Sequence, residues 1–167
     1  MDPRRAEVLS IGTVPVVHGV VQVGAATSTL VRPARRSATD GIVAHHLRPS
    51  EVAVAPPLTQ VLPGLLAAIA DAQAVVAHHA VLDVTVLRRA CAATGLAWTR
   101  PAVIDTVDLI LRVRRRQRST GGGRQLSREL GGARRELGLP AYPAHDARLD
   151  AIAAAELYLA LQARLTG

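Results

Sequence analysis

The most informative absence in this sequence is lysine, because all 20 basic residues among its 167 are arginine. Without lysine the chain has no P-loop lysine, no Schiff-base amine and no catalytic Ser–Lys pair. The formal net charge is nevertheless +7, which favours a polyanionic partner, with nucleic acid ahead of an acidic membrane surface. A composition that uses arginine wherever other proteins use lysine explains the same charge, so charge alone does not choose between these interpretations.

Aromatic residues and cysteine are almost as scarce. Phenylalanine is absent, the aromatic residues are Trp98, Tyr142 and Tyr158, and Cys91 stands alone. The core must therefore consist of Val, Leu, Ile and Ala, and the Ala-rich and Val-rich stretches predict a mixed α/β domain. A single cysteine cannot form an internal disulfide, and its apolar helical surroundings predict a buried core residue rather than a nucleophile.

Long apolar runs are also missing. No stretch approaches the roughly 18–20 apolar residues of a membrane span, and residues 1–5 lack the apolar core of a signal peptide. We therefore expect a cytoplasmic protein that does not enter a membrane. A chain of 167 residues is long enough for one domain with a real core and too short for two, so residues 1–167 are predicted to form a single domain.

The spacing of apolar residues predicts the order of the elements. The chain opens with a hairpin, whose strands cover residues 7–17 and 20–32 around a turn at His18-Gly19. Pro15 should make the first strand irregular or place it at an edge. The next predicted elements are a long connection at 33–57, a helix at 58–72, a strand at 75–77, a helix from Leu82, a strand at 103–104, a helix capped by Thr106, a glycine loop at 121–123, a helix at about 126–137 that ends at Gly138, and a last helix at about 145–165.

Two clusters of acidic and histidine residues lie at predicted helix starts. Residues 78–83 leave a buried strand and enter a helix, so Asp83 lies where open α/β sheets tend to bind ligands. Residues 145–150 place Asp150 one turn into the last helix, with His145 at or just before the N-cap. Carboxylates and histidine without cysteine suit Mg²⁺ or Mn²⁺ better than Zn²⁺. Taken singly, each cluster is also explained by ordinary helix capping.

In their order and spacing the clusters resemble the second and third motifs of the DnaQ-like exonucleases, the family of RNase T and of the proofreading epsilon subunit of bacterial DNA polymerase III. Residues 76–83, Val-Ala-His-His-Ala-Val-Leu-Asp, are similar to Val-x-His-Asn-Ala-x-Phe-Asp. Residues 145–151, His-Asp-Ala-Arg-Leu-Asp-Ala, match His-x-Ala-x-x-Asp-Ala of the histidine-containing branch. Between them, residues 104–106 resemble the family's Leu-Asp-Thr, and residues 125–139 its Ser-Leu-x-x-Leu and Leu-Gly-Ile stretch.

The resemblance covers nearly the whole chain, with departures. Residues 7–12 resemble the family's Glu-Ile-Leu-x-Ile-Gly strand, and residues 40–42 its His-Gly-Ile. In the second motif, Asn is replaced by His79 and Phe by Leu82. The first motif, Asp-x-Glu-Thr-Thr-Gly, is absent from the sequence; in the family it lies on the central strand, just before the segment with which this sequence starts, and supplies two of the four metal-binding carboxylates. We therefore expect the in-frame DNA upstream to encode an Asp-x-Glu strand.

The resemblance implies a ribonuclease H-like mixed sheet, flanked by helices, that lacks its first, central strand. It implies a 3′–5′ exonuclease that releases nucleoside monophosphates from single-stranded DNA or RNA 3′ ends by two-metal hydrolysis. Asp83 and Asp150 would hold Mg²⁺ or Mn²⁺, within roughly 4–8 Å of each other. His145 would be the general base and His79 a substrate contact. With half the carboxylates, the chain as given would be impaired or inactive.

Seven arginines fall between Arg112 and Arg128. Among them Arg114, Arg115 and Arg116 are the candidates to follow a nucleic-acid backbone, although a solvated helix face explains them equally. A DNA polymerase subunit is a further partner that the resemblance allows. The alternative function is a non-catalytic nucleic-acid-binding or polymerase-associated module that has lost the first motif. The sequence does not distinguish DNA from RNA as substrate, or proofreading from repair and RNA processing.

Overall fold

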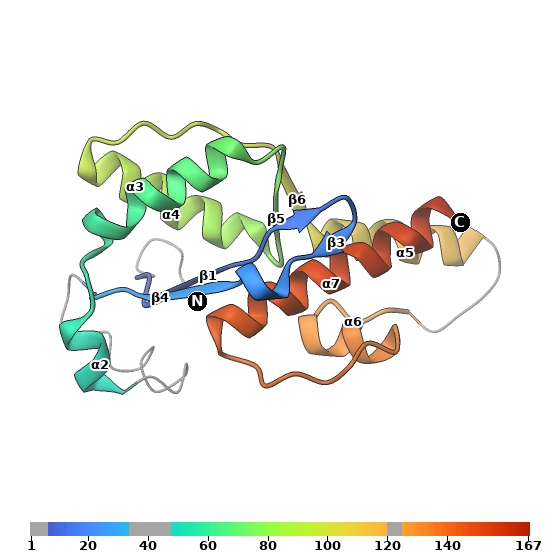
Figure 1. Cartoon of the computed structure of the whole chain (residues 1–167). Helices are drawn as coiled ribbons and strands as arrows, with labels where there is room; N and C mark the ends of the chain where they lie inside the picture. Colours follow the sequence, from blue (N-terminus) through green and yellow to red (C-terminus); the bar gives the residue numbers. More distant parts are fainter. Residues whose placement is uncertain (1–6, 34–47, 120–124) are drawn as a thin grey trace.

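The computed structural model describes residues 7–33, 48–119 and 125–167. Short strands near the middle of the molecule are surrounded by helices (Figure 1), so the predicted mixture of helix and strand is confirmed. In chain order the elements are β1 (Ser10–Thr13), β2 (Val16–Val17), β3 (Val20–Val21), the 3-10 turn η1 (Val23–Ala25), β4 (Thr27–Leu30), α2 (Pro49–Val54), α3 (Leu58–Asp71), β5 (Val75–Ala77), α4 (Ala80–Thr94), β6 (Val103–Asp105), α5 (Thr106–Ser119), α6 (Leu130–Glu136) and α7 (Ala147–Thr166).

The N-terminal strands form a stepped hairpin. β1 pairs antiparallel with β4, and β2 pairs antiparallel with β3. The turn between β2 and β3 was predicted correctly, since His18 and Gly19 have φ values of 50 and 75, as a tight two-residue turn requires. Pro15, which has no N–H to donate, lies where the ladder is interrupted. The predicted hairpin is thus present, but its strands are shorter and less continuous than expected.

A second pair of strands lies apart from the hairpin. β5 and β6 are parallel, with Val76 opposite Ile104. Within the described ranges no strand joins β5 and β6 to β1 and β4, so the sheet is interrupted between these two pairs. Helix α7 packs against both β1 and β5 and therefore spans the interruption. Gly12 permits the close approach of β1, because a Cβ at this position would overlap the Ala147 carbonyl.

Two hydrophobic clusters hold the helices together. The larger lies between α5, α6 and α7 and includes the fully buried Ile110, Leu157 and Leu161. The smaller lies between α3 and α4 and includes Leu62 and Cys91. Cys91 is 1% exposed, which confirms that it is a core residue. In the described part of the chain, no helix is both long and apolar enough to cross a membrane.

Two predicted helix starts are displaced. α4 begins at Ala80, two residues before Leu82, because the turn that precedes it is held by a side chain described below. α6 begins at Leu130 rather than further upstream. The N–H of Ser127 donates to the carboxylate of Glu136, and this hydrogen bond holds the residues before α6 in a non-helical conformation.

One helix was not predicted at all. α2 lies inside residues 33–57, which we expected to be an irregular connection. Pro49 at its first position and Glu51 in its first turn both favour a helix start. The apolar periodicity that identifies longer helices is too weak over six residues to be recognised. Residues 40–42 and the glycine loop at 121–123 lie outside the described residues.

Candidate active site

The first acidic cluster is built on a sharp turn between β5 and α4. His79 has left-handed backbone angles, φ 61 and ψ 45, and is the N-cap of α4. For a non-glycine residue this conformation costs roughly 1–2 kcal/mol, so its surroundings must hold it in place. Asp105, at the end of β6, does so: its Oδ1 accepts the N–H of His79 at 3.1 Å, and its Oδ2 accepts the N–H of Ala80 at 2.9 Å.

Asp105 also caps the neighbouring helix. Its Oδ1 accepts the N–H of Val107, in the first turn of α5, at 2.9 Å. Thr106, which we predicted to be this cap, is fully buried, and its hydroxyl shares a 2.7 Å hydrogen bond with Nδ1 of His78. The prediction was wrong because the Thr106 hydroxyl is already engaged by that imidazole. One carboxylate therefore joins the starts of α4 and α5.

The two histidines before α4 differ in their surroundings. His78 is half-buried, and burial lowers its pKa, with the charge of His79 acting in the same direction and that of Asp105 opposing it. A neutral His78 bonded to Thr106 is a structural residue. The ring of His79 lies edge-on to that of His78, with centroids 4.8 Å apart, and is exposed. His79 is therefore the histidine of this pair that can meet a substrate.

Asp83 lies in the first turn of α4, as predicted. Desolvation of its carboxyl raises the pKa of Asp83 to about 6, although the residue as a whole is exposed to solvent. The negative charge of Asp105 adds to this rise, whereas hydrogen bonding to the backbone and the charge of His79 oppose it. A carboxyl that is costly to ionise by itself gains from a nearby cation, because a positive charge favours the ionised form.

The second cluster lies at the start of α7. Asp146 is the N-cap, and its Oδ1 accepts the N–H of Leu149 at 2.9 Å. Asp150, one turn further on, is half-buried, and burial raises its pKa. Hydrogen bonds from the backbone of His145 and the hydroxyl of Tyr142, together with the charge of His145, act in the opposite direction. Asp146 is thus occupied in capping, and Asp150 is the carboxylate available for another role.

His145 lies directly before the cap of α7, where we expected it. Its φ of 71 is left-handed, so the chain bends sharply as it enters the helix. This bend brings the backbone of His145 into hydrogen-bond contact with the carboxyl of Asp150. The side chain of His145 is exposed. The backbone of His145 and the carboxyl of Asp150 are therefore close to each other.

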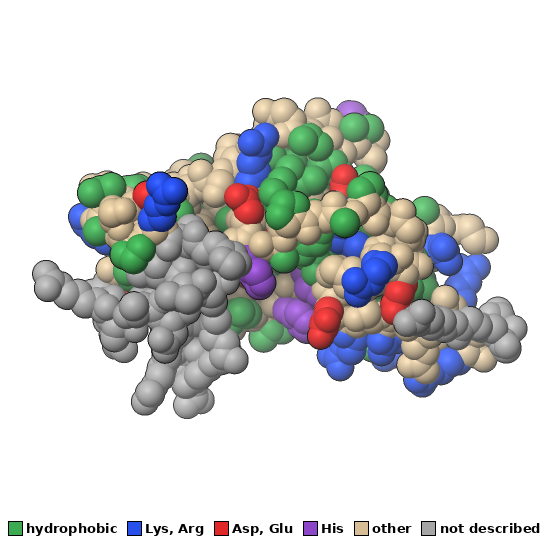
Figure 2. All heavy atoms as spheres, turned by 90° about the horizontal axis from the view of Figure 1, so that it is seen from below, with side chains coloured by type: hydrophobic (Ala, Val, Ile, Leu, Met, Phe, Trp, Pro, Cys, Tyr) green, Lys and Arg blue, Asp and Glu red, His purple; other side chains and the backbone are tan. Residues whose placement is uncertain are grey.

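The predicted site residues fall into two halves. His79 interacts electrostatically with Asp83, and His145 with Asp150. Figure 2 shows histidine and acidic side chains near one another in the middle of one face. Over the ranges that the structure describes, no three His, Cys, Asp or Glu side chains are grouped closely enough to hold a metal ion. The short separation of Asp83 from Asp150 stays a prediction.

Two of the three predicted backbone-binding arginines make contacts inside the fold. Nε and Nη2 of Arg114 both donate to the carbonyl of Leu126. Nη1 of Arg116 donates at 2.7 Å to a backbone carbonyl in the last turn of α7. That turn is about 20 Å along the helix from Asp150, at 1.5 Å per residue. Arg115 is exposed on the same helix, and the role of all three in substrate binding stays a prediction.

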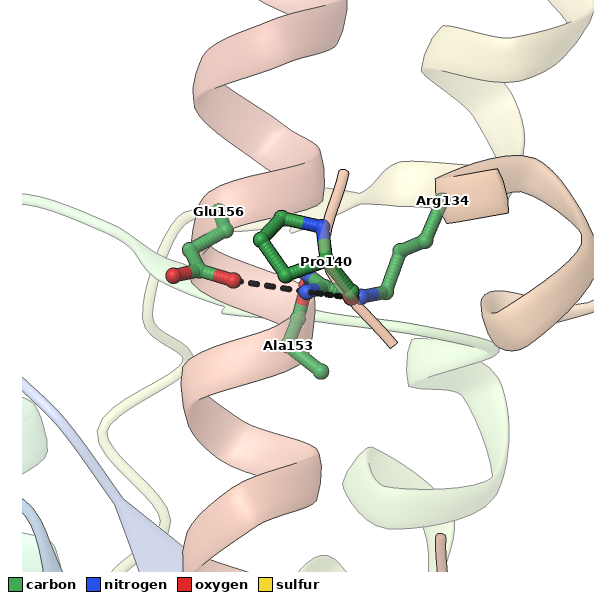
Figure 3. Close-up of polar contacts among 4 residues, drawn as sticks. All are labelled: Arg134, Pro140, Ala153 and Glu156. Atoms are coloured by element: carbon green, nitrogen blue, oxygen red, sulfur yellow. Dashed lines mark hydrogen bonds and ion pairs between the residues drawn. The ribbon is translucent and has the colours of Figure 1, made fainter. Parts of the chain in front are cut away.

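Sequence reasoning missed Arg134 and Tyr142. Arg134 is 3% exposed and forms an ion pair with Glu156, in which Nη2 and Oε2 are 2.7 Å apart. Its Nη1 donates to the carbonyl of Ala153 at 2.9 Å, and Nη2 donates to that of Pro140 at 3.0 Å (Figure 3). The guanidinium also lies over the ring of Tyr142, 5.1 Å from its centroid. The available signal was an arginine within the apolar stripe of a short helix.

The described strands thus form an interrupted mixed sheet, and an acidic residue lies in the first turn of both α4 and α7. The chain belongs to the RNase T exonuclease family, whose model matches residues 1–158. Its structure is similar to that of exonuclease X in complex with 5′-overhanging duplex DNA, with a TM-score of 0.71 and 21% identity over 95% of this chain and 84% of that one. Among curated proteins there is no significant match. The DnaQ-like resemblance and the ribonuclease H-like fold are thus confirmed.

Proposed function

We propose that this protein is a metal-dependent 3′–5′ exonuclease, which releases nucleoside monophosphates from DNA or RNA 3′ ends. Membership of an exonuclease family supports a nuclease; the activity of this chain, its polarity, the metal and the substrate are our proposal. The observation that carries it is the pairing of Asp150 with His145 at the start of α7, the helix that spans the interrupted sheet. A half-buried carboxylate beside an exposed imidazole supplies a cation ligand and a proton acceptor at one place.

The donor atoms fit a hard divalent cation. Asp83 and Asp150 offer carboxylate oxygens, the ligands that Mg²⁺ and Mn²⁺ prefer. Cys91, the single thiol, is buried in the core, so the set suits Mg²⁺ or Mn²⁺ better than Zn²⁺. Burial raises the pKa of both carboxyls, and a bound dication would offset the cost of ionising them. When bound, such ions neutralise charge that develops on the scissile phosphate and on the leaving 3′ oxygen.

The remaining steps fall to side chains of the two helix starts. His145 would accept the proton of the attacking water on a ring nitrogen, a role for which imidazole is the commonest group at neutral pH. His79, exposed above α4, would contact the substrate near Asp83. Arg115 would meet the backbone of the nucleic acid further away.

The first motif is absent from the sequence, and the site would be correspondingly weak. Two carboxylates offset less of the cost of stripping water from Mg²⁺ than four would. We therefore propose that the 167-residue chain hydrolyses nucleic acid slowly or not at all by itself. An upstream strand that carries Asp-x-Glu would restore the activity.

The test compares the chain alone with a version that carries the upstream in-frame segment, with Asp150→Asn in each as the matched control. Single-stranded DNA and RNA oligonucleotides, labelled at either end, are incubated with Mg²⁺ or Mn²⁺. We expect mononucleotides from the 3′ end, only with the longer version and only with Asp150 intact. Digestion from the 5′ end, cleavage that survives Asp150→Asn, or vigorous digestion by the short chain would contradict the proposal.

A non-catalytic nucleic-acid-binding or polymerase-associated module of the same fold is the second candidate. The absence of the first motif and the net charge of +7 favour it. It predicts that the chain binds oligonucleotides with an affinity that neither Mn²⁺ nor Asp150→Asn changes. An exonuclease bound to its substrate through cations would instead bind more tightly when Mn²⁺ is added.

A further inference from the structure

The segment between α6 and α7 leads directly into the second half of the site. Residues 137–146 contain no regular helix or strand and end with His145 and the cap Asp146. The path of this segment therefore determines the position of His145. Arg134, in α6, contacts both this segment and α7, so it joins the approach to the site with the helix that carries it.

Arg134 is an unusual residue to bury, since removing a guanidinium from water is costly unless it is fully paired. Glu156, on α7, supplies the opposite charge. Only Arg134 is buried in this pair, since the side chain of Glu156 is 36% exposed, and a pair of this kind is a weak source of stability because apolar residues of similar volume often replace a buried ion pair without loss. An arginine instead contributes orientation, because its planar guanidinium holds several N–H donors in a fixed geometry. Here the donors reach the carbonyls of Ala153 in α7 and Pro140 in the segment (Figure 3).

The contact with Tyr142 extends this arrangement to the site. The Arg134 guanidinium lies over the Tyr142 ring, and the Tyr142 hydroxyl is hydrogen-bonded to the carboxyl of Asp150. In this hydrogen bond the phenol O–H donates and the carboxylate oxygen accepts. An unbroken series of contacts thus runs from Arg134 through Tyr142 to Asp150.

We propose that Arg134 is a positioning residue for the α7 half of the active site. By holding Pro140 and the ring of Tyr142 against α7, it aims the Tyr142 hydroxyl at Asp150 and fixes the bend at His145. This inference rests on the proposed function, because it gives Asp150 the task of binding a cation. It predicts that loss of the fork weakens cation binding even where folding is intact.

The decisive variant is Arg134→Met/Glu156→Met, which removes both charges together and so avoids an unpaired buried charge. Three properties are measured: the denaturant midpoint of unfolding, the affinity for Mn²⁺ from the electron paramagnetic resonance of the free ion, and hydrogen exchange of the amides at 141–146. We expect the midpoint of the parent chain, about tenfold weaker Mn²⁺ binding, as for other residues that orient metal ligands, and about tenfold faster exchange. Arg135→Met, at the exposed neighbouring position, is the matched control and should change none of them.

Arg134→Lys provides a second route if the double variant does not fold. A lysine keeps the charge beside Glu156 but cannot bond two carbonyls and stack on a ring at once, so Mn²⁺ binding and loop exchange should change as in the double variant. Mn²⁺ affinity and loop exchange like those of the parent chain, in either folded variant, would overturn the proposal. If Asp150→Asn leaves Mn²⁺ binding to the parent chain unchanged, the proposed function fails at this site, and the exchange rates alone then decide the role of Arg134.

Discussion

At the scale of single residues, the candidate site consists of carboxyls that are costly to ionise. Burial raises the pKa of both Asp83 and Asp150, and a histidine lies next to each of them. Ionisable groups with shifted pKa values are common where proteins bind cations or move protons. The sequence motifs predicted which residues these are. They did not predict the burial or the partners, because Tyr142 approaches Asp150 from a segment with no regular structure, and Arg134, in α6, contacts that tyrosine rather than Asp150.

Replacing Asp83 by Asn should stabilise the cation-free protein at neutral pH. The folded protein holds the Asp83 proton more tightly than the unfolded chain does, since the pKa rises from 3.8 to about 6. The contribution of Asp83 to the free energy of unfolding is therefore fully present below about pH 4 and is lost as the pH rises through about 6. Because the residue is exposed and water screens its charge, we expect a gain of no more than about 1 kcal/mol, or about 2–4 °C in Tm, at pH 7.

The pH series provides the check on this assignment. The gain from Asp83→Asn should vanish near pH 3, where Asp83 is protonated in both states. Asp108→Asn, at an exposed position on α5, should leave Tm unchanged at both pH values. A lower Tm for Asp83→Asn at pH 7 would mean that the carboxylate makes a stabilising contact in the cation-free protein, which would contradict this assignment.

His145→Ala should abolish most hydrolysis in the version that carries the upstream strand. A general base contributes roughly 10²–10⁴-fold to a rate, so single-turnover release of mononucleotides should slow by that factor, with little change in Tm because the side chain is exposed. Asp150→Ala should lose at least as much, through cation binding. His18→Ala, in the hairpin turn, is the control and should keep the full rate. An unchanged rate for His145→Ala would remove this residue from the mechanism.

At the scale of the elements, the spacing of apolar residues predicted the long amphipathic helices and the buried strand between them. The helix at α3, the strand at β5 and the last helix appear within one or two residues of their expected ends. The errors lie where polar side chains bond the backbone. Thr106 was expected to cap α5, yet Asp105 does so, because an imidazole from another element takes the hydroxyl. Such competition between distant partners leaves no trace in a local sequence pattern.

Asp105→Ala should be among the most destabilising single changes near the site. It leaves the N–H groups of His79, Ala80 and Val107 without their acceptor, and each lost cap typically costs about 1 kcal/mol. We expect a loss of about 2–3 kcal/mol by chemical denaturation. His79→Gly, which tolerates the left-handed turn, should recover part of this loss.

The same pair of variants tests whether Asp105 supports Asp83. If Asp105 holds the turn, Asp105→Ala should also weaken Mn²⁺ binding, and adding His79→Gly should not restore the affinity. Asp105→Asn keeps one acceptor oxygen and should lie between the two extremes in stability. A loss below about 0.5 kcal/mol for Asp105→Ala, the usual scale of an uninvolved surface change, would contradict this account of the turn.

At the scale of the whole molecule, helix α7 contacts both the interrupted sheet and the arginine-rich helix α5. α7 spans the interruption and has Asp150 in its first turn, shortly after His145 and the cap Asp146. Of the arginines of α5, Arg116 reaches the last turn of α7, where it donates to the carbonyl of Leu165. The fold class and this order of elements could be predicted from motif spacing. The direction of the arginines could not, because a helical pattern does not say which face a neighbouring helix covers.

The arginines should therefore separate into one that binds nucleic acid and two that support the fold. Affinity for single-stranded oligonucleotides should fall with salt, and each phosphate contact that is removed should reduce the slope of log K against log salt by about 0.7. Arg115→Gln should reduce the slope by about this amount and leave Tm unchanged, because its side chain is exposed. Arg114→Gln and Arg116→Gln should instead lower Tm, since each loses a bond to a backbone carbonyl. Filter-binding titrations from about 50 to about 200 mM salt, together with thermal unfolding of the same samples, distinguish the two effects. An unchanged slope for Arg115→Gln would mean that this helix face is solvated surface. The nucleic acid would then have to bind along another part of the protein.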